Sequence, residues 1–257
     1  MSRPHYTTEV VDPSTLSPAA RAELTNALYA SHRCVFDGVD RDAFAAYVVD
    51  SPAAETRIMV LRGEGGRVRG YAAMHLFWHS HMGRRVQIVR MEVAAEPAYR
   101  GINFAGPFIA LSVLRLAVRF PGVPRYFFAC FVHPSAYVSL CRHAPRVWPH
   151  PGVETPPHIE ALMSGLERRF HLERVGEGTV KVGWIARGAC ASPRRLSPEA
   201  RFYLEHNPGY VRGEGLMTVL DCGARAAVEG TVDFARHLIR RRVSALRASL
   251  PRRVPAT

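Results

Sequence analysis

The chain has 257 residues, of which 47% are hydrophobic, enough for one large core or for one core with a small appended lobe. Its apolar runs are broken by proline or arginine before they reach the ~20 residues of a membrane span, and no apolar signal region opens the chain, so we expect a cytoplasmic protein. The net charge of +12 suits anionic partners of any kind, but Lys181 is the only lysine, and arginine with abundant alanine is typical of a GC-rich genome. We therefore favour a solvated arginine-rich surface over a nucleic-acid face.

Several functional classes lack their sequence signatures. The five cysteines are scattered without a CxxC pair, which argues against a disulfide framework and against a cysteine-based zinc site. No G-x-S-x-G elbow is present, and no G-x-x-x-x-G-K-[ST] loop, so neither a serine hydrolase nor a P-loop enzyme is expected.

The first half of the chain predicts a mostly antiparallel arrangement. A strand over residues 5–12 precedes a helix with Ser17 as its N-cap and Pro18 at its first position, and a second short helix starts at Asp40. Two apolar runs flank the glycines of residues 63–66 and indicate a hairpin. A third consecutive strand ends at Ala95.

The second half alternates helices with strands. We expect a helix from Gly101 to about Phe120. After it come a buried strand at residues 125–133, a short helix at 134–144, a Pro-rich connector at 145–157 and a helix at 158–170. A strand at residues 179–187, a loop at 205–215 and a strand at 216–223 follow. A basic amphipathic helix ends the chain. The fold class is thus mixed α/β with one βαβ crossover. We expect a main domain over residues 1–186 and a C-terminal extension over residues 187–257 that packs on the same core.

The stretch RMEVAAEPAYRGINFAG, residues 90–106, joins an apolar strand to an apolar helix. A helix start leaves about four backbone N–H groups without partners at the positive end of the helix dipole, so a pyrophosphate fits there if small residues let it approach. Asn103 is tolerated in a left-handed or tight conformation, and we expect the turn to form around it. A purely structural strand–helix corner is the alternative.

The element order over residues 6–185, taken with this turn, resembles the GNAT superfamily of N-acetyltransferases. The family pattern is a Pro-containing corner and then Arg/Gln-x-x-Gly-x-Gly/Ala at a helix start; Tyr99-Arg100-Gly101 and Ala105 match it, and Asn103 replaces the central glycine. The resemblance implies a mixed, mostly antiparallel sheet flanked by helices. It also implies coenzyme A or acyl-CoA, with the pyrophosphate on the turn and the pantetheine arm along the end of the strand. The residues implied for this binding are Val93, Ala94, Ala95, Arg100, Gly101, Ile102, Asn103, Phe104, Ala105 and Gly106.

N-acyl transfer needs a base for the amine and a proton for the leaving thiolate. Strand alternation assigns Val89, Met91 and Val93 to one face, which we expect to be core, and Ile88, Arg90 and Glu92 to the other. The resemblance implies a carboxylate base at the position of Glu92. An ion pair between Arg90 and Glu92 that only bridges strands is the alternative.

The proton donor is less clearly indicated, because the family's Leu-Tyr pair reads Leu140-Cys141 here. Cys141 stands where the tyrosine acid is expected, with a small apolar filler as the alternative role; Tyr137, one turn earlier, is a further candidate. His133 ends the strand at the place where the family's strands splay apart. It is a candidate base or substrate contact.

His75, His79 and His81 fall on one face of a strand, where such spacing separates side chains by roughly 7 or 14 Å. No acidic partner is evident, so we expect polar residues that face a substrate cleft and no metal site.

These observations predict an N-acyltransferase that moves an acyl group from a thioester to the amine of a small molecule or peptide. The donor is acyl-CoA or the phosphopantetheine arm of an acidic acyl carrier protein, which arginines of the last helix would steer. These arginines are Arg236, Arg240, Arg241, Arg242 and Arg247. The competing hypothesis is a degenerate fold that senses a ligand or contacts nucleic acid without catalysis, because the motif glycine and the tyrosine are both missing.

Overall fold

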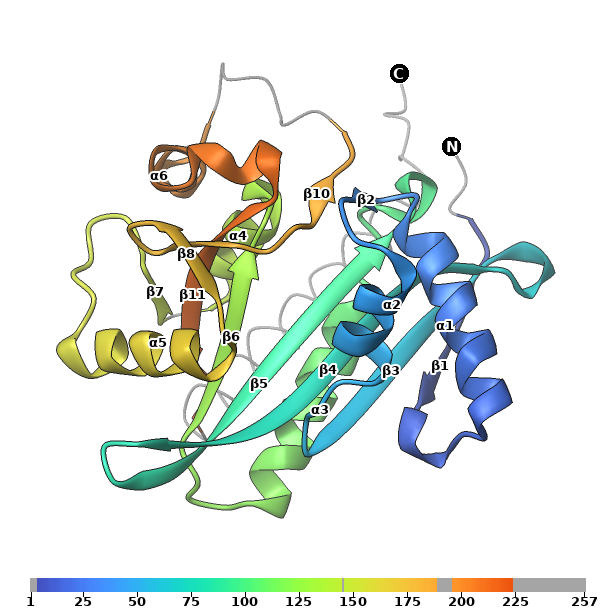
Figure 1. Ribbon diagram of the computed structural model, residues 1–257, viewed down its shortest axis with the longest axis horizontal. Helices are drawn as coiled ribbons and strands as arrows, with labels where there is room; N and C mark the ends of the chain where they lie inside the picture. The colour runs from blue at the N-terminus through green and yellow to red at the C-terminus, as the bar shows by residue number, and fades with distance from the viewer. Residues whose placement is uncertain (1–3, 145, 189–195, 224–257) are drawn as a thin grey trace, which may run out of the picture.

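A nine-stranded mixed sheet runs through the molecule (Figure 1). The computed structural model describes residues 4–144, 146–188 and 196–223, and all statements on the fold concern these. The strand order is β1-β3-β4-β5-β6-β11-β9-β8, with β7 beside β11. The strands are β1 (Thr7–Val11), β3 (Glu55–Arg62), β4 (Val68–His81), β5 (Arg84–Ala95), β6 (Arg125–Phe131), β7 (Val147–Trp148), β8 (Glu173–Gly176), β9 (Thr179–Lys181) and β11 (Glu214–Asp221). A separate pair joins β2 (Phe36–Asp37) to β10 (Ile185–Ala186).

Helices cover both faces of this sheet. The front face, turned toward the viewer in Figure 1, carries α1 (Pro18–His32) and α2 (Arg41–Phe44) at one side and α5 (Pro157–Arg169) at the other. The back face packs α3 (Ala105–Arg119) under β3 to β5, and α4 (Pro134–His143) with α6 (Pro198–His206) under β6 and β11. The expected mixed α/β class with a mostly antiparallel sheet flanked by helices is confirmed.

Local signals position the helices on the front face. The Ser17 hydroxyl accepts the N–H of Ala20 at 3.2 Å, so the predicted cap of α1 is confirmed. Asp40 caps α2 in the same way, accepting the N–H of Ala43 at 2.8 Å. The helix then continues into a π-helical turn, Ala45–Val49, which turns Tyr47 toward the sheet.

The crossover β5–α3–β6 makes the one parallel pair among the described strands, and this pair separates early. The strands are in register only from Gln87 opposite Arg125 to Val89 opposite Phe127. A buried hydrogen bond from Arg125 Nε to Gln87 Oε1, at 2.7 Å, lies at the closed end of the pair. Beyond Val89, β5 is paired with β4 alone, so its other edge is left open where the two strands diverge.

The region after residue 172 departs from the sequence prediction. The single strand expected over residues 179–187 is wrong: it breaks at Gly183, whose φ of 82° turns the chain from β9 into the separate pair with β2. The hairpin partner β8 and the helix α6 were not predicted, and residues 208–212 of the expected loop form a 3₁₀ helix. Strand β11 pairs with β6 and thus lies in the main sheet. The predicted basic C-terminal helix lies outside the described residues.

Over the described ranges, none of the helices combines the length and the apolar character that crossing a membrane requires.

Candidate functional site

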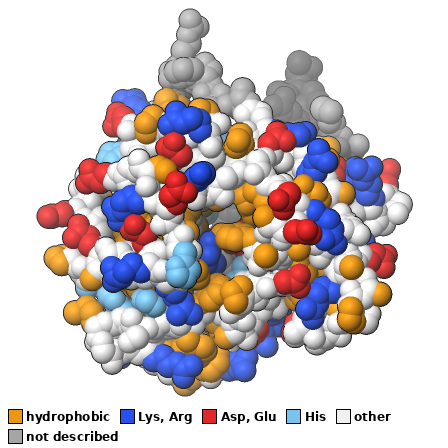
Figure 2. All heavy atoms as spheres, viewed as in Figure 1, with side chains coloured by type: hydrophobic (Ala, Val, Ile, Leu, Met, Phe, Trp, Pro, Cys, Tyr) orange, Lys and Arg blue, Asp and Glu red, His pale blue; other side chains and the backbone are white. Residues whose placement is uncertain are grey.

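The front face is hollowed near its centre, between the side that α1 and α2 cover and the side that α5 covers (Figure 2). Strands β5 and β6 diverge beneath this region. Alternation on β5 places Arg90 and Glu92 on the front face, because Ile88 of the same face packs with Phe77 and Phe128 in the front core. Arg90 and Glu92, which are 7% and 8% exposed, thus lie on the face of the sheet that carries this hollow.

Glu92 is paired with a histidine of the neighbouring strand. Its Oε2 lies 2.9 Å from Nε2 of His75, and the two side chains are 7% and 2% exposed. The approach is off the line of a good hydrogen bond, and neither atom has another hydrogen-bond partner among the described residues. His75 Nδ1 lies 3.0 Å from the Thr56 hydroxyl, which can donate to it. The row Thr56–His75–Glu92 thus crosses three adjacent strands and sets the carboxylate against an imidazole.

The side chain of Arg90 contacts Tyr47, whereas that of Glu92 contacts His75. It donates from Nη2 to the Tyr47 hydroxyl and lies over the Tyr47 ring, 4.8 Å from its centroid. Burial holds the pKa of Tyr47 well above its usual value, with Arg90 opposing the shift and Glu92 adding to it. Burial also raises the pKa of Cys130, on the adjoining part of β6, to about 12. Both groups therefore stay protonated, and the Tyr47 hydroxyl remains a hydrogen-bond donor beside the carboxylate.

The turn after β5 is well ordered by its own backbone. Tyr99 N bonds to Glu96 O at 2.8 Å, and Gly101 has a φ of 79°, a conformation that favours glycine. The turn forms, but Asn103 does not itself adopt a left-handed conformation. Instead, its Oδ1 accepts the N–H of Gly106 at 3.1 Å. The side chain thus acts as a cap for α3 and occupies one of the N–H groups that a phosphate would use.

The remaining residues implied for coenzyme A divide between core and surface. Ala94, Phe104 and part of Ile102 pack into buried clusters, so only their backbone groups are available to a ligand. Val93 is 42% exposed, which corrects its assignment to the core. Val89 and Met91 of the same face pack into the cluster that α3 covers, and that cluster does not extend to Val93.

Arg100 and His133 lie near each other, just beyond the ends of β5 and β6. His133 caps α4, accepting the N–H of Ser135 on Nδ1 at 3.2 Å. Burial lowers its pKa, and the nearby Arg100 lowers it further. Arg100 itself donates to the carbonyl of Arg187 at 3.3 Å. His133 therefore lies near the turn as a neutral imidazole with its ring proton on Nε2. Glu92, by contrast, lies within the sheet.

Cys141 and Tyr137 lie elsewhere. Both belong to the back-face cluster with Tyr203 of α6, whereas Glu92 is on the front face. The Tyr137 hydroxyl donates to the carbonyl of Pro149 at 2.8 Å, and burial raises the pKa of Cys141. The structure does not bring either group to Glu92.

His79 and His81 lie toward α5 and not with His75 in the hollow. His79 is next to Gly165, and the pKa of His81 is lowered by burial and by the neighbouring His158. In the described part of the chain, no three His, Cys, Asp or Glu side chains are grouped as a metal ion would need.

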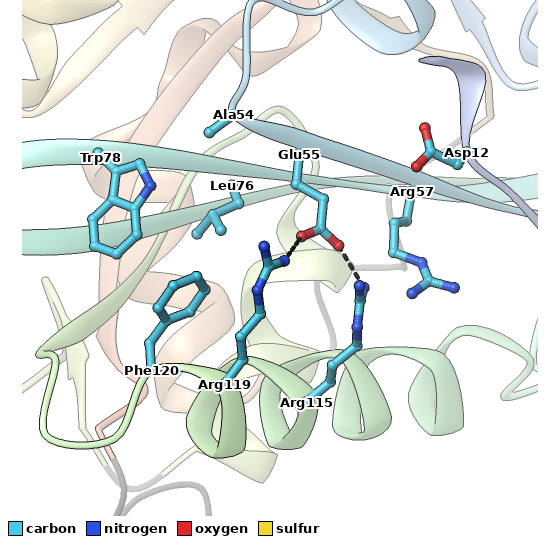
Figure 3. Close-up of a pocket in the computed structure, with 9 residues that line it drawn as sticks. All are labelled: Asp12, Ala54, Glu55, Arg57, Leu76, Trp78, Arg115, Arg119 and Phe120. Carbon is cyan, nitrogen blue, oxygen red and sulfur yellow. Dashed lines mark hydrogen bonds and ion pairs between the residues drawn. The ribbon is translucent and has the colours of Figure 1, made fainter. Parts of the chain in front are cut away.

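A cavity of about 240 Å³ lies on the back face, apart from these residues (Figure 3). Glu55 reaches from β3 between Arg115 and Arg119 of α3 and pairs with both, while Trp78 packs edge-on against Phe120. The cavity lies where α3 packs against the sheet, and the two ion pairs of Glu55 join the helix to β3 there.

Tyr47 is not indicated by the sequence, and His75 is expected only as a polar residue facing a substrate cleft, without its pairing to Glu92. Strand register could have located His75, since a hairpin alignment places it directly opposite Arg90. Tyr47 carries no such signal, because its position depends on the π-helical turn after α2.

No protein-family model matches the chain, and no curated protein does. Solved structures do show likeness. A conserved protein of unknown function from Enterococcus faecalis, described as a probable N-acyltransferase, is 12% identical over 56% of this chain and 33% of that chain, with a TM-score of 0.36. A Trypanosoma brucei acetyltransferase is 16% identical over 59% of this chain and 96% of its own, with a TM-score of 0.34. Glucosamine-6-phosphate N-acetyltransferase from Arabidopsis thaliana is 9% identical over 59% and 97%, with a TM-score of 0.35. This chain thus spans a third of the Enterococcus protein, and at such values the likenesses carry no functional inference.

Proposed function

We propose that this protein is an N-acyltransferase that moves an acyl group from a thioester, acyl-CoA in the first instance, to an amine. The observation that carries the proposal is the position of Glu92. A buried carboxylate, paired with His75, lies on the front face of the sheet where β5 leaves β6, and the same strand leads directly into the turn and the amino end of α3. A base and a phosphate-binding element are thereby joined by one strand.

The residues suit the donor. The open edge of β5 beyond Val89 offers backbone N–H and C=O groups to the amides of a pantetheine arm, as in the addition of a strand to a sheet. The turn from Arg100 to Gly106 offers the positive end of a 15-residue helix to the pyrophosphate. Asn103 would have to yield the N–H of Gly106 or donate its own amide to the phosphate.

The chemistry follows from the front-face group. Glu92, directly or through one water, accepts a proton from the amine as its nitrogen attacks the thioester carbonyl. The C–N bond forms, the C–S bond breaks, and the thiolate leaves with the electron pair and takes up a proton. Tyr47 supplies a hydroxyl donor nearby, and His75 keeps the carboxylate oriented through Thr56.

The test measures thiol release from acetyl-CoA with a panel of amines, together with coenzyme A binding by calorimetry. Glu92→Gln should lower kcat by about 100-fold or more with little change in KM, because a general base acts in the transition state. Glu55→Gln, an ion-paired carboxylate on the opposite face, is the matched control and should keep wild-type kcat.

Absence of coenzyme A binding would refute the proposal outright. Binding without thiol release from any amine, and without any effect of Glu92→Gln, would instead indicate a ligand-sensing module. Duplex DNA binding that weakens steeply with salt would favour the nucleic-acid alternative.

A further inference from the structure

Arg90 presents a cation on the front face of the sheet. The residue is 7% exposed, and its guanidinium lies between aromatic rings, 4.8 Å from the centroid of Tyr47 and 4.5 Å from that of Phe170. These two rings come from the turn after α2 and from the end of α5, the two sides of the hollow. Arg90 is therefore held from both sides.

The hydrogen-bonding capacity of Arg90 is mostly unused. A guanidinium carries five N–H donors in a planar fork, and the described residues accept one bond from it, at the Tyr47 hydroxyl. No carboxylate of the described residues forms an ion pair with it, because Glu92 is turned toward His75.

The unused donors are not fully sealed from solvent. Nη2 of Arg125, elsewhere in the same sheet, is sealed from solvent without a partner, but no nitrogen of Arg90 is in that state. The partnerless nitrogens of Arg90 thus keep a small contact with solvent. Removing a charge from water without pairing it is costly, so a buried and rigid guanidinium of this kind is suited to an anionic ligand.

We propose that Arg90 binds a carboxylate of the substrate, so that the hollow selects an amine acceptor or an acyl group that carries one. This inference rests on the proposed function and specifies its substrate class. A guanidinium fork matches a carboxylate through two parallel hydrogen bonds. Glu92 follows Arg90 on the same face at a spacing of about 7 Å. A short amino acid spans this interval with its ammonium group at Glu92 and its carboxylate at Arg90, which makes the acceptor the preferred bearer of the charge.

The other ionisable groups around Arg90 do not supply a cation for the carboxylate. Tyr47 and Cys130 stay protonated and carry no charge, and Glu92 supplies the negative end that an ammonium group needs. The rings of Phe128 and Phe170 offer apolar walls that suit a short carbon chain.

The experiment compares matched substrates that differ only in the carboxylate. One arm uses acetyl-CoA with β-alanine and with β-alaninamide. The other uses ethanolamine as acceptor with succinyl-CoA and with butyryl-CoA. Full-length wild type is compared with Arg90→Met and Arg90→Lys, and with Arg85→Met, which removes an exposed cation–π arginine from the same strand. Thermal unfolding of each variant establishes that it is folded.

We expect wild type to prefer the carboxylate member of one arm by at least tenfold in kcat/KM. Arg90→Met should lower kcat/KM about 100-fold on that substrate and less than threefold on its uncharged analogue, because the bound carboxylate loses its buried cationic partner. Arg90→Lys should restore part of the loss, and Arg85→Met should behave as wild type. Equal use of charged and uncharged substrates by wild type, or equal losses on both in Arg90→Met, would overturn the inference.

A second readout separates this inference from the proposed function. Ligand-observed NMR measures binding of β-alanine and of succinate to the protein without turnover. Binding that Arg90→Met abolishes supports the carboxylate site even if no acyl transfer is found. Absence of binding of both probes to wild type, with or without coenzyme A, overturns the inference even if acyl transfer occurs with uncharged amines.

Discussion

The side chain of Asn103 gives a prediction in which protein stability and ligand affinity move in opposite directions. Its Oδ1 accepts the N–H of Gly106 at 3.1 Å and so caps α3 at the place where a pyrophosphate would bind. Asn103→Gly removes the cap, at a cost of a few tenths of a kcal/mol in the free energy of unfolding. It also frees the N–H. A hydrogen bond contributes about 1 kcal/mol net, so the affinity for coenzyme A should rise about fivefold.

Asn103→Asp has the reverse effect. A carboxylate at a helix start stabilises the helix by about 0.3–1 kcal/mol. The same charge repels the pyrophosphate across a few ångströms, which should weaken coenzyme A binding by more than tenfold at low salt. No simple loss of structure produces this pair of results, because a damaged turn would lower both quantities.

Chemical denaturation and calorimetry measure the two effects on the same preparations. Pantetheine, which lacks the pyrophosphate, is the control ligand, and its affinity should be nearly the same for wild type and both variants. If the aspartate variant binds coenzyme A as tightly as wild type, or if pantetheine responds as coenzyme A does, the pyrophosphate does not lie at this turn.

Three further predictions concern stability. In Gly106→Ala the new Cβ would lie 2.5 Å from Asn103 Oδ1, so a double-mutant cycle with Asn103→Gly in urea should give a coupling of about 1 kcal/mol, and additive effects would contradict the contact. Burial lowers the pKa of His32 from 6.5 to about 4, so between these pH values the unfolded chain binds a proton that the folded protein does not; the free energy of unfolding should fall on acidification by up to ~1.4 kcal/mol per pH unit, and His32→Gln should reduce that slope in urea titrations. Glu55→Gln should cost about 0.5–1 kcal/mol, since both arginine partners are about half exposed, and the cost should shrink in 1 M NaCl.

Much of the fold could be predicted because local signals and the long-range order agree. The hairpin of β3 and β4 follows from two apolar runs around glycines, and the caps at Ser17 and Asp40 follow from side-chain chemistry within three residues. Strand alternation on β5 placed Arg90 and Glu92 together on one face. Each of these inferences needs only the period of a strand or the first turn of a helix.

The rest depends on contacts between segments distant in the sequence. Nothing in residues 179–187 shows that Gly183 turns the chain toward β2, because the pairing partner lies about 150 residues earlier. Tyr47 reaches Arg90 only through a π-helical turn, a choice that propensities do not encode. The sequence shows that Asn103 is tolerated in the turn, but it does not show that its side chain caps α3 while Gly101 takes the positive φ.

The alternation of β5 also predicts how donor and acceptor variants combine. Asn103 belongs to the turn that opens the back-face helix α3, whereas Arg90 lies on the front face, and the described contacts give them no shared partner. Effects of separate sites without shared partners add within about 0.5 kcal/mol. The double variant Asn103→Gly, Arg90→Met should therefore keep the gain in coenzyme A affinity and the loss on the carboxylate substrate, each at its single-variant size. Calorimetry and kcat/KM on the four proteins of the cycle measure this. A coupling well above 1 kcal/mol would mean that the turn and Arg90 are not independent, and the assignment of the pyrophosphate to one and of the carboxylate to the other would fail.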